Sequence, residues 1–260
     1  MGSRFVVHRD EIAGRPADGA TERPILTEDF GCAFLTESVR SLDPGTTAGP
    51  YESGGHEEVL FVLAGTGALL VGGQEIEFGP ESGIQIALGE TYQLRADGSV
   101  TVELVGVRVL HPAGDEVPAG LRRVISRLDE QDLGHATAGR EYRILAGPET
   151  GFRSGTHFVG YIPTGAPAPV HYHRYDEVIY VLEGEGVLHI EGEHNPLRAG
   201  SCILLPARVL HQIENTGDVP IREVAVFVPG GSPAAAFLPD GTSAYAGQAD
   251  DPDRPSDGTT

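Results

Sequence analysis

The chain has 260 residues, is 40% hydrophobic and carries a formal net charge of -20 at pH 7, with every one of its 18 basic residues an Arg. A surface this acidic repels nucleic acid and anionic membranes, which excludes both as partners. Two Cys are too few for a disulfide framework, and no apolar run reaches the roughly 18 residues of a membrane span. We therefore expect a cytoplasmic enzyme or binding protein.

The composition favours a turn-rich all-β protein, because 36 Gly and 19 Pro are distributed among many short apolar runs. Residues 1–31 have weak periodicity and are expected to form an N-terminal arm with a short strand. Strand-like runs then recur at short intervals, as is typical of a β-sandwich or barrel. The strands expected in the first half are Cys32–Val39, Glu58–Leu63, Gly67–Val71, Glu75–Phe78, Ile84–Leu88, Thr91–Arg95 and Val100–Val109.

The second half of the chain repeats the first. At a constant offset of 119 residues the two align without a gap for about sixty residues, which predicts a tandem duplication of one β domain. We expect barrels at 32–110 and 141–230, a linker at 111–140, and from 231 to 260 an extension that ends in a disordered acidic tail. The matched pairs include Pro44 and Pro163, Pro50 and Pro169, Glu58 and Glu177, Gly65 and Gly184, Gly67 and Gly186, Gly73 and Gly192, Ile84 and Ile203, Gln93 and Gln212, and Gly98 and Gly217.

The matched glycines are explained by turn geometry alone. Gly65 and Gly184, and likewise Gly98 and Gly217, follow the ends of strands, where we expect a positive φ.

Four residues of the second half have the chemistry of a metal site. His171 and His173 alternate, so in extended backbone both side chains point to the same side. Glu177 follows at the start of an apolar strand, and His211 begins another strand further on. A lone His on an apolar face is usually an ordinary core residue. Four such groups buried together without a metal would lack partners at a cost of several kcal/mol, so we predict a mixed nitrogen and oxygen site for a divalent transition metal.

These residues stand in two motifs that resemble those of the cupin superfamily. Gly165-x5-His171-x-His173-x3-Glu177-x6-Gly184 resembles the first cupin motif along its whole length, and Gly200-x5-Pro206-x4-His211-x3-Asn215 resembles the second. Arg208 stands where the second motif usually has Gly. With the repeat, the resemblance covers roughly residues 32–230 and implies a bicupin, with two tandem jelly-roll barrels and the metal ligands His171, His173, Glu177 and His211.

The first half lacks the ligands. At the same offset His171 corresponds to Glu52, His173 to Gly54 and His211 to Tyr92, and only Glu58 is retained. We therefore predict a metal-free N-terminal barrel with a structural role.

Three imidazoles and one carboxylate leave two positions open on a six-coordinate ion, which suits Fe, Mn or Ni better than Zn. Open adjacent positions favour a small chelating substrate such as a keto acid, an enediol or a phenol, and we hypothesise a dioxygenase or other oxidoreductase. Tyr180 and His189 are candidates for binding this substrate.

Two other classes of function remain open. One is a non-redox hydrolase, isomerase or lyase: in length and in its degenerate first barrel the chain is similar to (S)-ureidoglycine aminohydrolases, although their second-barrel ligands follow a different order. The other is a metabolite-binding cupin without catalysis. Because exposed strand edges are commonly covered by arms or partners, residues 1–30 are also expected to contribute to a homodimer.

Overall fold

The computed structural model describes residues 3–32, 34–110, 122–165 and 167–245, together with Ala249 and Asp251. Within these residues the regular structure consists of strands and short 3-10 helices, with no α-helix. The strands that build the N-terminal barrel are β2 (Arg15–Ala17), β3 (Ala20–Leu26), β4 (Leu35–Leu42), β5 (Thr47–Glu52), β6 (His56–Ala64), β7 (Thr66–Val71), β8 (Gln74–Phe78), β9 (Ser82–Ile86), β10 (Thr91–Asp97), β11 (Val102–Leu110) and β12 (Ile125–Arg127).

The C-terminal barrel is built in the same way. Its strands are β1 (Val6–His8), β13 (Gly134–His135), β14 (Glu141–Ala146), β15 (Thr156–Ile162), β16 (Asp176–Glu183), β17 (Glu185–Ile190), β18 (Glu193–Arg198), β19 (Ser201–Leu205), β20 (His211–Asn215) and β21 (Ile221–Val228). The 3-10 helices are η1 (Arg9–Glu11), η2 (Glu28–Phe30), η3 (Leu128–Glu130), η4 (Thr137–Gly139) and η5 (Pro148–Thr150).

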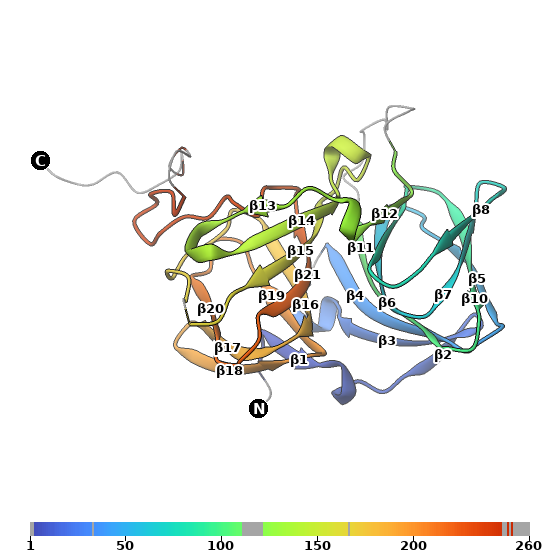
Figure 1. Cartoon of the computed structure of the whole chain (residues 1–260), viewed down its shortest axis with the longest axis horizontal. Helices are drawn as coiled ribbons and strands as arrows, with labels where there is room; N and C mark the ends of the chain where they lie inside the picture. The colour runs from blue at the N-terminus through green and yellow to red at the C-terminus, as the bar shows by residue number, and fades with distance from the viewer. Residues whose placement is uncertain are drawn as a thin grey trace, which may run out of the picture.

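Each barrel consists of a seven-stranded sheet facing a smaller one, and the two barrels lie side by side (Figure 1). The large sheets have the orders β12-β9-β6-β11-β4-β3-β2 and β1-β19-β16-β21-β15-β14-β13. The small sheets have the orders β5-β10-β7-β8 and β18-β17-β20. The expected all-β architecture of two tandem jelly-roll barrels is confirmed.

The first strand of each half has crossed to the other barrel. β1 pairs with β19 through Val6 and Ile203, and β12 pairs with β9 through Ile125 and Ile84. Ile125 lies 119 residues after Val6, and Ile203 lies 119 residues after Ile84, so the exchange obeys the same internal repeat as the barrels. Each seven-stranded sheet therefore contains one strand from outside its own barrel, which ties the two halves together.

Strands β6 and β16 are buried on both faces, because each has one barrel inside and the neighbouring barrel outside. Leu60 and Val62 point into the N-terminal barrel, whereas Val59 and Phe61 belong to a core shared with Val178 and Tyr180 of the other half. Burial on both sides explains why these strands have nearly continuous apolar sequences rather than an alternating pattern.

The glycines of one matched pair share a positive φ, whereas those of another pair do not. Gly65 and Gly184 have φ values of 80° and 87°, and a Cβ there would lie within 2.9 Å of main-chain atoms at the starts of β11 and β21, respectively. Gly98 has a φ of 84°, but Gly217 does not lie in the left-handed region, so the expectation for Gly217 is wrong. At Gly217 the constraint is space, since a Cβ would lie 2.9 Å from Cγ of Glu185.

The segments outside the two expected barrels are more structured than their sequences indicate. The expected arm, residues 1–31, supplies β1, β2 and β3, and the described part of the expected linker supplies β12 and β13. β1 and β12 have three residues each and pair with strands far away in the chain, which a local pattern does not reveal. Most of the tail expected from Gly247 onward lies outside the described residues. A homodimer stays a prediction.

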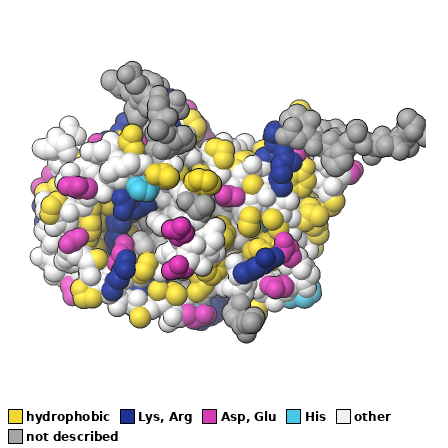
Figure 2. Space-filling model, turned by 180° about the vertical axis from the view of Figure 1, so that it is seen from behind, with side chains coloured by type: hydrophobic (Ala, Val, Ile, Leu, Met, Phe, Trp, Pro, Cys, Tyr) yellow, Lys and Arg dark blue, Asp and Glu magenta, His cyan; other side chains and the backbone are white. Residues whose placement is uncertain are grey.

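On the face of the molecule seen in Figure 2, the described Arg side chains are scattered among Asp and Glu rather than gathered in one basic patch. Among the described residues, no helix has the length and apolar character needed to cross a membrane.

Glu37 is buried in the core between the barrels, and its ionisation should make stability depend on pH. Burial raises the pKa of its carboxyl to about 8, and its Oε2 has no hydrogen-bond partner in the described structure. Because folding raises the pKa of Glu37, its protonated carboxyl contributes to the stability of the folded state. This contribution is fully present below pH 4.5, the ordinary pKa of the group, and is lost as the pH rises through about 8.

We therefore predict that Glu37→Gln removes part of this pH dependence. Relative to wild type, the variant should gain on the order of a few kcal/mol in unfolding free energy between pH 5 and 9. Urea denaturation followed by circular dichroism across this range measures the difference. A constant difference between the two proteins at all pH values would contradict the prediction.

Candidate metal centre

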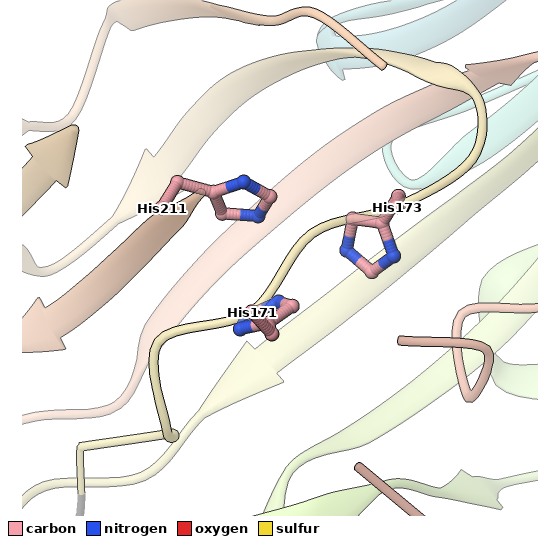
Figure 3. A group of neighbouring side chains, drawn as sticks. All are labelled: His171, His173 and His211. Atoms are coloured by element: carbon pink, nitrogen blue, oxygen red, sulfur yellow. The ribbon is translucent and has the colours of Figure 1, made fainter. Parts of the chain in front are cut away.

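The three histidines predicted as ligands are brought together at one end of the C-terminal barrel. His171 and His173 lie in the segment before β16, and His211 is the first residue of β20 (Figure 3). His171 and His211 are joined by backbone hydrogen bonds in both directions, of 3.0 and 2.9 Å. Candidate ligand nitrogens of the three rings all lie within 4.8 Å of one another.

Backbone carbonyls orient all three rings in the same way. Nδ1 of His171 lies 2.8 Å from the carbonyl oxygen of Pro169, and Nδ1 of His211 lies 2.9 Å from that of Val209. Nδ1 of His173 lies 2.9 Å from the carbonyl oxygen of Ala235, in the C-terminal extension. A carbonyl only accepts, so each Nδ1 carries the proton and each Nε2 presents a lone pair. This second layer of hydrogen bonds is characteristic of metal-binding histidines.

Burial keeps the rings neutral. It lowers the pKa of His171 to about 4 and that of His173 to about 3, and the pKa of His211 is also far below its ordinary value. Neutral imidazole is the form that binds metal, so the three rings are ready to act as ligands at neutral pH.

Glu177 lies beside the three rings but outside the closest group. Its Oε2 is 3.7 Å from Nε2 of His173, and its side chain is buried. Burial holds the pKa of Glu177 well above its usual range, and the nearby carboxylate of Glu223 adds to this effect, whereas Arg140 acts in the opposite direction. A cation bound among the imidazoles would favour the charged carboxylate.

The three rings and Glu177 line a cavity of about 50 Å³. Sequence reasoning missed two further residues that line this cavity, Arg140 and Glu223. Glu223 lies on β21 opposite Gly160, and a Cβ on Gly160 would come within 2.9 Å of its Oε1, so the glycine makes room for this carboxylate. At the offset of 119 residues Glu223 corresponds to Leu104. A carboxylate that replaces a core leucine was the signal available in the sequence.

Tyr180 and His189, our candidates for binding substrate, lie outside this cavity. Tyr180 faces the other barrel, lines a separate cavity of about 460 Å³ and accepts a hydrogen bond of 2.9 Å from Arg9. His189 points outward from β17, because its neighbours Leu188 and Ile190 fill the barrel interior, and its Nε2 lies 2.8 Å from Glu214. Because side chains alternate along a strand, neither Tyr180 nor His189 points into the cavity beside the three histidines, where we expected them to bind substrate.

In the N-terminal barrel the corresponding place holds an ion pair. Nη2 of Arg40 lies 2.8 Å from Oε1 of Glu58, and the hydroxyl of Tyr92 donates to Oε2 of Glu58 at 2.8 Å. Nη1 of Arg40 in turn donates to the Tyr92 hydroxyl at 2.7 Å. Glu58, the one retained ligand position, thus already has a cation of the protein as its partner.

Arg208 departs from the second cupin motif in sequence but keeps the backbone conformation that the motif's glycine allows. Its φ is 64°, in the left-handed region that costs a side-chain-bearing residue about 1–2 kcal/mol. Its backbone N–H donates to the carbonyl of His173 at 2.7 Å. The turn shape of the motif is therefore preserved, and the arginine side chain is accommodated at some cost.

The donor set fits a divalent transition metal. Three neutral imidazoles present unprotonated Nε2 atoms, for which the described residues provide no hydrogen-bond donor, and one carboxylate lies within reach. The three imidazoles can thus hold a metal ion.

The fold and this cluster of histidines define a double-barrel protein with a metal-binding capacity in one barrel. Residues 158–227 match the family model described as "Cupin domain". Over 114 residues the chain is 34% identical to Protein SchB of Streptomyces halstedii, and these residues are 43% of this chain and 72% of that protein. The chain belongs to the cupin superfamily, as a bicupin.

Two further proteins are similar to this chain. The oxalate-binding protein of Thermotoga maritima is 35% identical over 68 residues, which are 26% of this chain and 56% of that protein. A Bacillus subtilis oxalate decarboxylase structure, with Mn(II) centres, superimposes with a TM-score of 0.73 at 15% identity and covers 92% of this chain and 80% of its own. At this identity the superposition supports the fold alone.

The Arg40 ion pair gives a prediction about stability. Arg40→Met leaves the buried Glu58 without its cation and should lower the unfolding free energy by about 3–5 kcal/mol. Replacing both partners, in Arg40→Met with Glu58→Leu, should cost less than the single change. Urea denaturation followed by circular dichroism measures both values. A single variant as stable as wild type would show that the ion pair does not matter.

Proposed function

We propose that this bicupin is a divalent-metal-dependent enzyme that acts on a small chelating acid in its C-terminal barrel. The observation that carries the proposal is the convergence of three neutral imidazoles, each with its Nδ1 bound to a backbone carbonyl. A bound Fe, Mn or Ni ion supplies Lewis acidity and, in the oxidative form of the reaction, a path for electrons to dioxygen.

Arg140 is the residue that would recognise an acid. Its Nη2 donates to the carbonyl of Ile213 at 2.9 Å, and its Nε has no hydrogen-bond partner within the described structure. A divalent ion and Arg140 contribute three positive charges, and Glu177 and Glu223 contribute at most two negative ones. The net positive charge favours an anionic substrate, and the small cavity favours one with few heavy atoms.

The first form of the proposal is a dioxygenase or other oxidoreductase that acts on a keto acid, an enediol or a phenol. The similarity to part of the Thermotoga oxalate-binding protein makes a small dicarboxylate the first compound to test. In this form Arg140 holds a carboxylate of the substrate while the imidazole side of the cavity faces its chelating oxygens.

Glu223 favours a second candidate, a non-redox lyase or hydrolase. Burial raises the pKa of its carboxyl to about 7, with Arg140 acting in the opposite direction, and its Oε2 has no hydrogen-bond partner among the described residues. A carboxyl that titrates near neutrality beside the cavity is placed to give or take a proton.

The metal requirement is tested by elemental analysis of protein purified without chelators or a His tag. We expect about one ion per chain, and much less than a tenth of that in His173→Ala. The outward-facing His189→Ala is the matched control and should retain the ion. Wild-type protein without any bound transition metal after native purification and reloading would overturn the proposal.

Turnover in the absence of dioxygen separates the two candidates. A reaction that consumes dioxygen as its oxidant stops under strict anaerobiosis, whereas a reaction that uses no oxidant continues. Under the second candidate Glu223→Gln should abolish most of kcat, while the metal content stays that of wild type.

Substrate recognition is tested at Arg140. Because a hydrogen bond to a charged group contributes about 1.5–3 kcal/mol, Arg140→Gln should raise KM for an acid roughly 10- to 100-fold. Metal content should remain about one ion per chain, since Arg140 is not a ligand. The corresponding amide or ester of the substrate should discriminate little between the two proteins. Equal KM values for the acid would exclude Arg140 as its anchor.

A further inference from the structure

We propose that Asp251 is a positioning residue of the metal centre. Its carboxylate binds side chains both from the segment that carries His171 and His173 and from the segment that leads to His211. This inference rests on the proposed function, in which His171, His173 and His211 hold the metal. Asp251 lies forty residues beyond His211, in the C-terminal extension, and is 1% exposed.

The carboxylate of Asp251 contacts side chains from both segments. It accepts a hydrogen bond of 2.7 Å from the hydroxyl of Tyr172 and one of 3.0 Å from Nη1 of Arg208, and Nε of Arg174 lies 3.4 Å from it. Tyr172 and Arg174 flank His173 in the sequence, and Arg208 precedes His211 by three residues. One carboxylate therefore connects neighbours of all three proposed ligands.

Alternation along the chain explains why this contact bears on the rings. His171 and His173 point toward the cavity, so Tyr172 and Arg174 project to the opposite side, where Asp251 lies. The backbone N–H of Arg208 donates to the carbonyl of His173, which couples the two segments directly beneath the rings. A shift of Arg208 or of Tyr172 would therefore displace a histidine.

The segment that orients His173 is bound to the backbone of Tyr172, whose hydroxyl donates to Asp251. Phe237 exchanges backbone hydrogen bonds with Tyr172, of 2.9 and 3.0 Å, and Ala235 supplies the carbonyl that accepts from Nδ1 of His173. The hydroxyl of Tyr175, whose ring stacks on His173 at 5.2 Å, donates to the carbonyl of Ser232. The extension is thus part of the hydrogen-bonded layer around the proposed ligands.

Arg208 is the independent observation that singles out this contact. Its backbone is left-handed, a conformation that Gly adopts without strain and that the cupin motif fills with Gly. An arginine there is explained by what its guanidinium binds, which is Asp251. Because Gly relieves the backbone, Arg208→Gly separates the effect on folding from the effect on the metal centre.

The experiment compares Mn²⁺ affinity and thermal stability in wild type, Asp251→Asn, Arg208→Gly and a matched control. The control is Asp18→Gly, a second left-handed residue with φ 46°, in the exposed turn between β2 and β3 of the N-terminal barrel. We expect Asp251→Asn and Arg208→Gly to raise the Mn²⁺ Kd roughly 10- to 100-fold, as loss of outer hydrogen-bond partners does in metal sites. In the absence of metal, the Arg208→Gly protein should melt at no lower a temperature than wild type, and Asp18→Gly should keep the wild-type Kd.

The outcomes distinguish this inference from the proposed function. If wild type binds Mn²⁺ and both Asp251→Asn and Arg208→Gly bind it equally well, Asp251 is not a positioning residue, while the metal centre stands. If Arg208→Gly loses affinity only to the extent that it loses stability, the contact is structural and the inference is overturned. If wild type binds none of Mn²⁺, Fe²⁺ and Ni²⁺, both proposals fall.

Discussion

Neither barrel can bury the outer face of its large sheet by itself. Val59, Phe61, Val178 and Tyr180 form one shared core across the boundary, and a buried side chain of this size contributes roughly 1.5–3 kcal/mol. The exchanged strands β1 and β12 close the adjacent sheet edges, so that neither half has a complete large sheet without the other. The rigidity of β16, and with it the position of Glu177, depends on this packing.

The two barrels show what the same scaffold does with and without ligands. In the N-terminal barrel a guanidinium from β4 and a tyrosine at the position of His211 surround the retained carboxylate. In the C-terminal barrel the equivalent carboxylate faces imidazoles, and Gly160 on β15 leaves space for Glu223 from β21. A buried carboxylate stays charged only where it has a positive partner. One barrel provides it as Arg40, and we propose that the other takes it from solution as a metal ion.

The geometry of the histidines is set by main-chain atoms more than by side chains. Each Nδ1 is bound to a carbonyl, and the carbonyl that serves His173 belongs to the C-terminal extension. The candidate metal centre in the barrel is therefore completed by a segment outside it. Arg208, which departs from the cupin motif, binds the buried Asp251 through its guanidinium and the carbonyl of His173 through its backbone N–H.

The sequence by itself determined the all-β class, the duplication and the three histidines, because these depend on periodicity, on a fixed offset and on spacing within a short segment. The strands expected at Glu58–Leu63 and Gly67–Val71 lie within β6 and β7 to within two residues at each end. Only the tertiary structure placed Arg140 and Glu223 beside the rings, turned His189 outward and moved Tyr180 to the boundary between the barrels. It alone brought Asp251 to Arg208 and β1 to the opposite barrel. These outcomes depend on contacts between residues far apart in the chain, for which no local pattern exists.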